Sequence, residues 1–435
     1  MAAPGKLLPW LLGGALAAAG WLQGLHWRHT GRPDAGPADA SLAAKDERIA
    51  ALEREVARLS ARGRDGAELP VPPELVARVE REFGLAFRQP PVVRQTSADA
   101  LRDRVSAATE SRFGPGGLAD REFAWRWLGW LRPDDQLLAQ LTAVRATGAR
   151  AWFDDSSGEI WVNERDDATA IPSQAALLRA LTRALLHQHF PPPASYPGDD
   201  AWRARDAFHQ GLAGGSEARL LADHARANGF MPMAQNAESS QLLAALPPFL
   251  QGLTTFPAIA GKGYADGKFL QGDAVLQAAL RQPPALTRAI FHPDRQGEPA
   301  EPPALPVTPG DPILEESGGE LGVTLWLAPL DDEAATRAIA RDWAGDRYRL
   351  FPDGDDAAVI WDVRFARAES ADRFLAAALE FVSAQAGLDC TPAAGEIVRS
   401  PEGRHLAVAR VSPQVVRFAH TASMETLRPL VPAGK

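Results

Sequence analysis

The chain has 435 residues, and this length predicts two or three folded units rather than a single core. Its composition is that of an ordinary globular protein, with 46% hydrophobic and 23% charged residues. A formal net charge of −9 excludes the nucleic-acid-binding class, because no basic surface is available to displace counterions from phosphates. The single cysteine, Cys390, excludes an internal disulfide and is typical of a small buried hydrophobic residue.

The N-terminal region, 1–30, contains an uncharged stretch from Leu7 to Leu25. As a helix this stretch would span about 28 Å, which is near the hydrocarbon thickness of a bilayer. It is either a signal-anchor or a cleaved signal peptide, since three alanines at 17–19 resemble a cleavage site. We expect an anchor, with the N-terminus inside and the bulk of the protein outside the cytoplasm.

Residues 31–69 are predicted to form a linker and a short coiled-coil-like helix. Apolar residues recur at the a and d positions of a heptad, at Leu42, Ile49, Leu52, Val56 and Leu59. Because the repeat covers under three heptads, two interpretations stay open. The segment 41–63 is either a weak homo-oligomerisation stalk or a solvated spacer helix.

Residues 70–292 have the pattern of one mostly helical domain. A strand is predicted at 90–96, and a hairpin at 149–163 around the turn Asp-Asp-Ser-Ser-Gly. A helix is predicted from about Ser173, just after Pro172. Seven prolines fall within 293–312, which indicates an extended linker over 293–316 and a domain boundary.

Residues 317–435 predict a smaller α+β domain. Strand-like segments are expected at 320–328, 347–352, 357–365, 405–412 and 414–420, and helices at 331–344 and 370–385. The predicted fold class is therefore α+β: a mostly helical domain with a small β-hairpin or sheet, then a C-terminal α+β domain, preceded by an N-terminal membrane helix.

A family resemblance becomes specific at LLRALTRALLHQHF, residues 177–190. This segment resembles the zinc-binding helix of a bacterial HExxH, gluzincin-like metallopeptidase family, which reads approximately HELTHALQDQHF. The hairpin at 149–163 resembles the family's strand pair beside that helix. The segments at 282–295, 338–351 and 370–381 resemble further family segments in the same order. The resemblance therefore covers roughly 75–430 and implies a metallopeptidase-like fold for the helical domain.

The zinc ligands of the resembled motif are missing. Its first histidine corresponds to Arg179, its glutamate to Ala180 and its second histidine to Arg183. An arginine has no lone pair for a metal, and an alanine accepts no proton. The third ligand, a glutamate, would fall on Gly214 or Gly215, and Glu217 would replace it only with a helix shift. We expect no metal, no cofactor and no zinc peptidase activity.

The histidines do not rebuild a metal site. His187 and His189 lie two residues apart on a helix, so their side chains point about 200° apart. We expect them, together with His209 and His224, to be surface or capped histidines. His292 is expected to be a structural hydrogen-bonding residue.

Arg179 and Arg183 are predicted to lie opposite the leucine stripe of their helix, with His187 one turn further. They are either an exposed or internally salt-bridged pair, or a site that clasps Glu217, Asp223 or an anionic ligand.

The resemblance together with the loss of its ligands predicts a pseudo-peptidase of the bacterial inner membrane. It would pass the membrane once, with its bulk in the periplasm, or be secreted if the leader is cleaved. It would bind or scaffold peptides or proteins. The alternatives are a hydrolase with a rearranged site, formed by Glu217 with His187 or His209, and a purely structural envelope protein.

Overall fold

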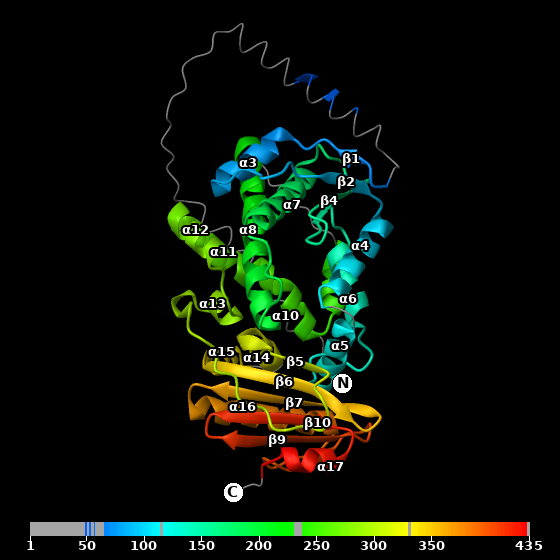
Figure 1. The fold of residues 1–435 in the computed structure, drawn as a ribbon, viewed down its shortest axis with the longest axis vertical. Coiled ribbons are helices and arrows are strands. Elements are labelled where there is room, and N and C mark those ends of the chain that lie inside the picture. The colour runs from blue at the N-terminus through cyan, green and yellow to red at the C-terminus, as the bar shows by residue number, and fades with distance from the viewer. Residues whose placement is uncertain are drawn as a thin grey trace. The chain divides into compact units, whose positions relative to one another are not determined.

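Figure 1 shows a computed structural model of the chain. The structure describes residues 65–113, 116–229, 237–328 and 332–432, and five isolated positions between 48 and 56. The chain divides into two compact units, 1–60 and 61–435.

In the first unit, the five described positions are helical. Three of the predicted heptad residues, Ile49, Leu52 and Val56, are exposed there. Leu42, Leu59 and the predicted membrane segment from Leu7 to Leu25 lie outside the described residues. Within the described part of the chain, no helix combines the length and the apolar character that crossing a bilayer requires.

The second unit is α+β, and helices make up most of its first two thirds. Its helices, including two short 3₁₀ segments and one π-helical segment, are α3 (Pro73–Phe83), α4 (Ala98–Ser111), α5 (Gly117–Trp127), α6 (Leu137–Ala146), α7 (Ile171–His189), α8 (Asp199–Asn228), α9 (Ala237–Ala245), α10 (Pro248–Phe256), η1 (Pro257–Gly261), α11 (Lys262–Leu270), α12 (Asp273–Arg281), α13 (Thr287–Phe291), η2 (Pro293–Arg295), α14 (Gly319–Leu327), α15 (Glu333–Arg341), α16 (Ala368–Ala386), α17 (Met424–Leu427) and η3 (Arg428–Leu430).

A small sheet of four strands lies beside α7. Its order is β1 (Glu68–Leu69), β2 (Val93–Thr96), β4 (Ile160–Asn163) and β3 (Ala151–Phe153), and only the β2–β4 pair is parallel. The predicted strand at 90–96 and the predicted hairpin at 149–163 are confirmed. Helix α7 begins at Ile171, so the prediction that it starts at about Ser173 is off by two residues. Pro172 lies in the first turn, where its missing N–H costs nothing, and the helix therefore starts before the proline.

The larger sheet has six antiparallel strands in the order β5 (Leu314–Glu316), β6 (Trp343–Asp353), β7 (Asp356–Phe365), β10 (Val415–Thr421), β9 (His405–Ser412) and β8 (Val398–Arg399). Helix α16 packs on one of its faces (Figure 1). Alternate residues of β7 enter two different cores: Trp361 and Val363 join a core with α16, and Ile360 joins a core with α17. Both faces are thus covered, as expected for a strand with the continuous apolar run from Ala357 to Trp361.

Two sequence predictions in this region are wrong. Of residues 320–328, predicted as strand-like, all but Ala328 belong to helix α14. Seven of its nine residues are buried, so the apolar pattern has no period that separates a buried helix from a buried strand. Cys390, predicted as a buried residue, is exposed in the segment after α16. A single cysteine carries no periodic signal that would place it inside or outside.

The proline-rich segment follows the outer edge of β6. The Glu301 amide donates a hydrogen bond to the Ala344 carbonyl at 2.8 Å, and the Arg349 guanidinium donates to the Pro306 carbonyl at 3.0 Å. A Cβ atom at Gly345 would lie 2.6 Å from the carbonyl carbon of Glu301. The division into domains 70–292 and 317–435 stays a prediction. One core contains Trp130 of the first region and Trp361 of the second, with ring centroids 5.4 Å apart.

Helix α8 packs against α7 on one side and against η1 and α11 on another. Two glycines bring α8 and η1 into backbone contact: a Cβ atom at Gly211 would lie 2.3 Å from the Gly261 carbonyl oxygen. A Cβ atom at Gly261 would lie 2.4 Å from the Ala207 carbonyl oxygen. Only glycine allows this approach, which fixes the position of α8 between its neighbours.

Candidate functional site

Helix α7 presents Arg179 and Arg183 to α8, on the face that the sequence predicts. The Arg179 guanidinium contacts Glu217 at 3.5 Å and Gln210 at 3.2 Å. Its side chain is 44% exposed, so these contacts are solvent-screened. Asp223, the other predicted acidic partner, instead binds Arg78 at 2.7 Å.

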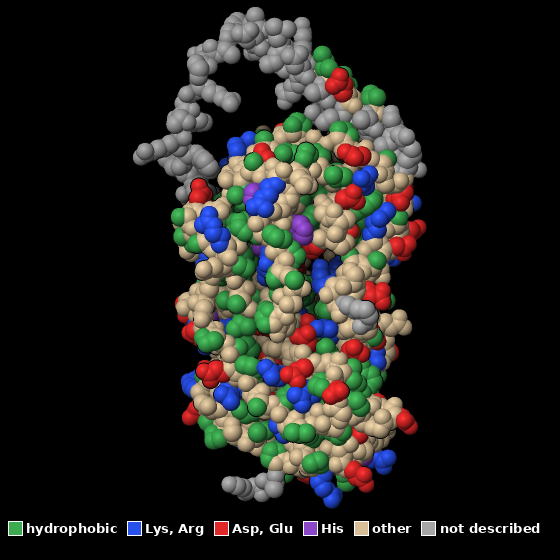
Figure 2. Space-filling view, in the orientation of Figure 1, with side chains coloured by type: hydrophobic (Ala, Val, Ile, Leu, Met, Phe, Trp, Pro, Cys, Tyr) green, Lys and Arg blue, Asp and Glu red, His purple; other side chains and the backbone are tan. Residues whose placement is uncertain are grey.

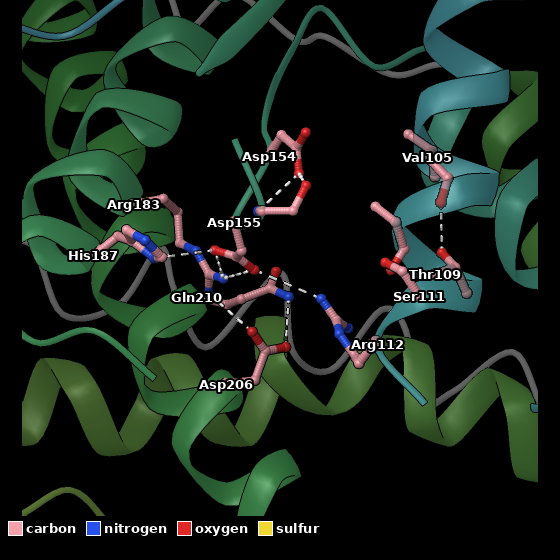
Figure 3. A network of polar contacts seen from close by, with 12 residues as sticks. Val105, Thr109, Ser111, Arg112, Asp154, Asp155, Arg183, His187, Asp206 and Gln210 are labelled. Carbon is pink, nitrogen blue, oxygen red and sulfur yellow. Dashed lines mark hydrogen bonds and ion pairs between the residues drawn. The ribbon is translucent and has the colours of Figure 1, made fainter. Parts of the chain in front are cut away.

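Arg183 is more enclosed and has two carboxylate partners. One of its nitrogens lies 2.9 Å from Asp206 of α8, and the other lies 3.2 Å from Asp155 in the turn between β3 and β4 (Figure 3). Although desolvation favours the neutral acid, the charges of Arg183 and Arg112 hold the pKa of Asp206 well below its usual range. Desolvation likewise works against the charged guanidinium, but Asp155 and Asp206 together raise the pKa of Arg183. This ion pair is therefore formed at all physiological pH values.

A second group of arginines lies across from α7. Arg112, just after α4, lies 3.6 Å from Asp155, and its guanidinium covers the ring of Trp202 at 4.6 Å from the ring centroid. In Figure 3 it approaches Asp155 from the side opposite Arg183. Arg145 of α6 donates to the Thr109 hydroxyl at 3.1 Å. We call Arg112, Arg145, Arg183 and Arg205 the arginine cluster.

The cluster has more positive than negative charges. Among the described residues, neither Arg145 nor Arg205 makes an ion pair with a carboxylate. Desolvation, together with the charge of Arg112, lowers the pKa of Arg145 to about 10. Desolvation also lowers the pKa of Arg205, and the charge of Arg183 adds to this effect. A pKa below the ordinary value is typical of a guanidinium whose charge is not balanced.

The two histidines near the cluster are both shifted toward their neutral forms. Desolvation lowers the pKa of His187, whose ring lies 4.0 Å from Asp155 and packs edge-on against Phe153. His209 is only 7% exposed, so the prediction that it is a surface or capped histidine is wrong. Its helix turns it inward, and within the described part of the chain its Nε2 atom has no hydrogen-bond partner. Desolvation and the charge of Arg183 lower its pKa well below the ordinary value.

The other predicted site residues lie apart from the cluster. Ala180 is buried in the hydrophobic core beside α8. A Cβ atom at Gly214 would meet no atom within 4 Å, so that position faces open space. Gly215 lies beside Arg219 and Asp266.

The remaining histidines have local partners. His189 contacts the Ala86 carbonyl at 2.7 Å, and His224 contacts the Asn228 amide at 3.1 Å. His292 lies 2.7 Å from Glu320, as expected for a structural hydrogen-bonding residue. Across the described residues, no group of three or more His, Cys, Asp or Glu side chains is placed to hold a metal ion.

Sequence reasoning missed Arg112, Arg145, Arg205, Asp155 and Asp206. These residues come from three helices or their ends and one turn, and no spacing in the chain links them. The signal that was available is the turn itself, because Asp154 and Asp155 begin the Asp-Asp-Ser-Ser-Gly sequence. Asp154 is held within that turn by Ser156 and Ser157, which leaves Asp155 to face the arginines.

The space-filling view shows a hollow in this part of the molecule. It lies between α8 and the α4–α6 helices, and both Lys or Arg and Asp or Glu side chains gather in it (Figure 2). Arg145 is exposed to solvent, although surrounding protein atoms desolvate it enough to lower its pKa. A guanidinium with both properties lies in a recess rather than on an open surface.

Fold and site together define an α+β protein with an arginine-rich recess in its helical part. Residues 310–428 match a family model described as a domain of unknown function (DUF8575). The matched segment contains all six strands of the larger sheet with the covering helices α16 and α17, and it lies outside the arginine cluster. No curated protein and no solved structure matches the chain.

Proposed function

We propose that the chain is a catalytically inactive, metallopeptidase-like envelope protein that binds peptides or proteins through the recess of the arginine cluster. One observation carries the proposal. The two positions that correspond to the zinc-binding histidines, Arg179 and Arg183, are ion-paired with carboxylates of α8 and of the β3–β4 turn. A permanently charged guanidinium there supplies positive charge and leaves no lone pair for a metal.

A hydrolase with a rearranged site has less support. It needs Glu217 to converge with His187 or His209 around one pocket. Glu217 contacts Arg179, and the carboxylate nearest to His187 is Asp155. Within the described part of the chain, no ion pair joins Glu217 to either histidine.

A purely structural protein also has less support than a binding protein. A filled cleft would present its charges in balanced pairs, because an unpaired buried charge is costly. Arg145 is exposed, Arg205 is half-buried, and neither has a carboxylate partner among the described residues. Their remaining N–H groups face an accessible recess, which favours a site for an anionic partner over a filled cleft.

We also propose that the protein is anchored in the bacterial inner membrane with its bulk in the periplasm. The uncharged stretch from Leu7 to Leu25 supports an anchor. The exposed apolar residues Ile49, Leu52 and Val56 support weak self-association through 41–63.

The proposal is tested by two measurements on the full chain. Elemental analysis is expected to find less than stoichiometric zinc, and a casein assay to find no proteolysis that a chelator abolishes. Calorimetry with acidic and basic peptides of equal length is expected to detect binding of the acidic set, weakened in Arg179→Ala/Arg183→Ala. Stoichiometric zinc, or acidic-peptide binding unchanged in that variant, would overturn the proposal.

A further inference from the structure

The charges around the recess do not balance. The arginine cluster contributes four positive charges, and Asp155 and Asp206 are the two carboxylates that affect its pKa values directly. His187 and His209 add no charge near neutral pH, because both pKa values are lowered. Asp154 acts on His187 and is bonded within its own turn. Two positive charges remain without a partner.

The arginines that carry this excess also have free donors. A guanidinium has five N–H groups. Arg145 uses one of its N–H groups on the Thr109 hydroxyl, and the outer nitrogen of Arg205 donates to the carbonyls of Phe190 and Pro191. Arg112 lies 3.6 Å from Asp155, which is beyond hydrogen-bond distance, and the Trp202 ring supports its planar face. All three arginines lie near Asp206 or its partner Arg183, and their remaining N–H groups are available to a ligand.

A neutral polar group lies beside these arginines. The Nε2 atom of His209 is buried and has no hydrogen-bond partner in the described part of the chain. A buried polar atom without a partner is rare unless a ligand or ordered water satisfies it. Tyr196 lies near the same charges, since Arg205 and Asp206 both affect its pKa.

We propose that the recess binds an oxyanion group with two negative charges, held by Arg112, Arg145 and Arg205. Two charges neutralise the excess, and the planar fork of arginine matches the oxygens of phosphate and carboxylate. The group is a phosphate monoester or a pair of carboxylates. This inference rests on the proposed function, because it names the group by which a ligand is held in the recess.

The test uses isothermal titration calorimetry with the full chain at constant ionic strength. The probes are inorganic phosphate, succinate and acetate. We expect one site per chain, with a dissociation constant below about 1 mM for a doubly charged probe and at least about tenfold weaker binding of acetate. Tighter binding of phosphate assigns the site to a phosphate group, and tighter binding of succinate assigns it to paired carboxylates.

Four variants and a matched control test the residues. Arg145→Gln and Arg205→Gln are each expected to weaken binding at least about tenfold, because each removes a charge-assisted contact. Arg145→Lys and Arg205→Lys keep the charge and are expected to restore part of the affinity. Arg102 lies on α4 with a side chain that is 56% exposed, so Arg102→Gln controls for a general loss of charge.

Equal affinity in Arg145→Gln, Arg205→Gln and Arg102→Gln would overturn the inference, and so would the absence of binding by both doubly charged probes at 10 mM. Thermal melting of each variant shows whether it is folded, and the lysine variants keep the test valid if a glutamine variant is not. Phosphate or succinate binding without any peptide binding would overturn the proposed function alone. Peptide binding that Arg145→Gln and Arg205→Gln leave unchanged would overturn this inference alone.

Discussion

The contact between Arg183 and Asp206 is the best place in the arginine cluster to measure how much an ion pair contributes to the free energy of unfolding. The two side chains are 17% and 12% exposed, and the joining N–O distance is 2.9 Å. Arg183→Met would leave both Asp155 and Asp206 without their main partner. Asp206→Asn would leave Arg183 still paired with Asp155 and would keep a polar group beside Gln210.

The expected magnitudes differ between the two substitutions. Breaking a fully buried pair costs about 3–5 kcal/mol, and partial exposure lowers this toward about 2–3 kcal/mol for Arg183→Met. Asp206→Asn is expected to cost about 1 kcal/mol, because one carboxylate remains for Arg183. The double variant is expected to be no less stable than Arg183→Met alone. The resulting coupling energy is about 1–2 kcal/mol.

Urea denaturation followed by tryptophan fluorescence measures these free energies of unfolding. Since the pKa of Asp206 is held below its unfolded value, its contribution is complete above the unfolded pKa. The contribution is lost as the pH falls through the folded pKa, so the cost of Asp206→Asn is expected to shrink on acidification. A coupling energy below about 0.3 kcal/mol at pH 7 would refute the assignment of a direct, partly buried ion pair.

Two further predictions concern stability. Gly214→Ala is expected to stabilise α8 by about 0.5–1 kcal/mol, because alanine favours the helix and the new Cβ atom meets no neighbour. Gly211→Ala on the same helix is expected to lower the melting temperature, because its Cβ atom would lie 2.3 Å from the Gly261 carbonyl oxygen. Equal effects of the two variants on the melting temperature would contradict this packing. Desolvation raises the pKa of Asp200 to about 7, with Asp346 adding to the shift and Arg203 and Thr287 opposing it. A raised pKa gives stability that is complete below the unfolded pKa and is lost as the pH rises through the folded pKa. The free energy of unfolding is therefore expected to fall between pH 5 and 8, and Asp200→Asn is expected to remove this fall. The same fall in Asp200→Asn would contradict the raised pKa.

The sequence predicts the elements of the fold well where an apolar pattern has a clear period. The helix at 171–189 and the hairpin at 149–163 both appear as expected, because leucines recur on one helical face and a turn sequence separates two β-rich runs. Helix α14 differs from the predicted strand because it is buried on nearly all sides. A continuous apolar run has neither the helical nor the strand period, so its tertiary contacts determine whether it forms a helix or a strand.

The candidate site was predictable in part. Helical spacing places Arg179 and Arg183 on one face, and both contact α8 in the structure. The sequence does not predict that the remaining arginines join the site, because they lie on separate elements. Arg112 follows α4, Arg145 lies in the last turn of α6, and Arg205 lies on α8. Charged residues that come together only through tertiary packing show no regular spacing in the sequence. His209 shows the same limit, because a lone histidine on a long helix does not reveal whether it faces inward.

The proline-rich segment along β6 has a consequence for how the molecule behaves in a crowded compartment. The open edge of an antiparallel sheet offers unpaired amides and carbonyls to any extended chain that it meets, and such edges lead to aggregation. Here the Glu301 amide donates a hydrogen bond to the Ala344 carbonyl. Its neighbour Pro302 has no amide hydrogen with which to pair with a further strand. Residues predicted as a spacer between domains, together with β5, therefore cover the outer edge of β6 and hinder the addition of a foreign strand to it.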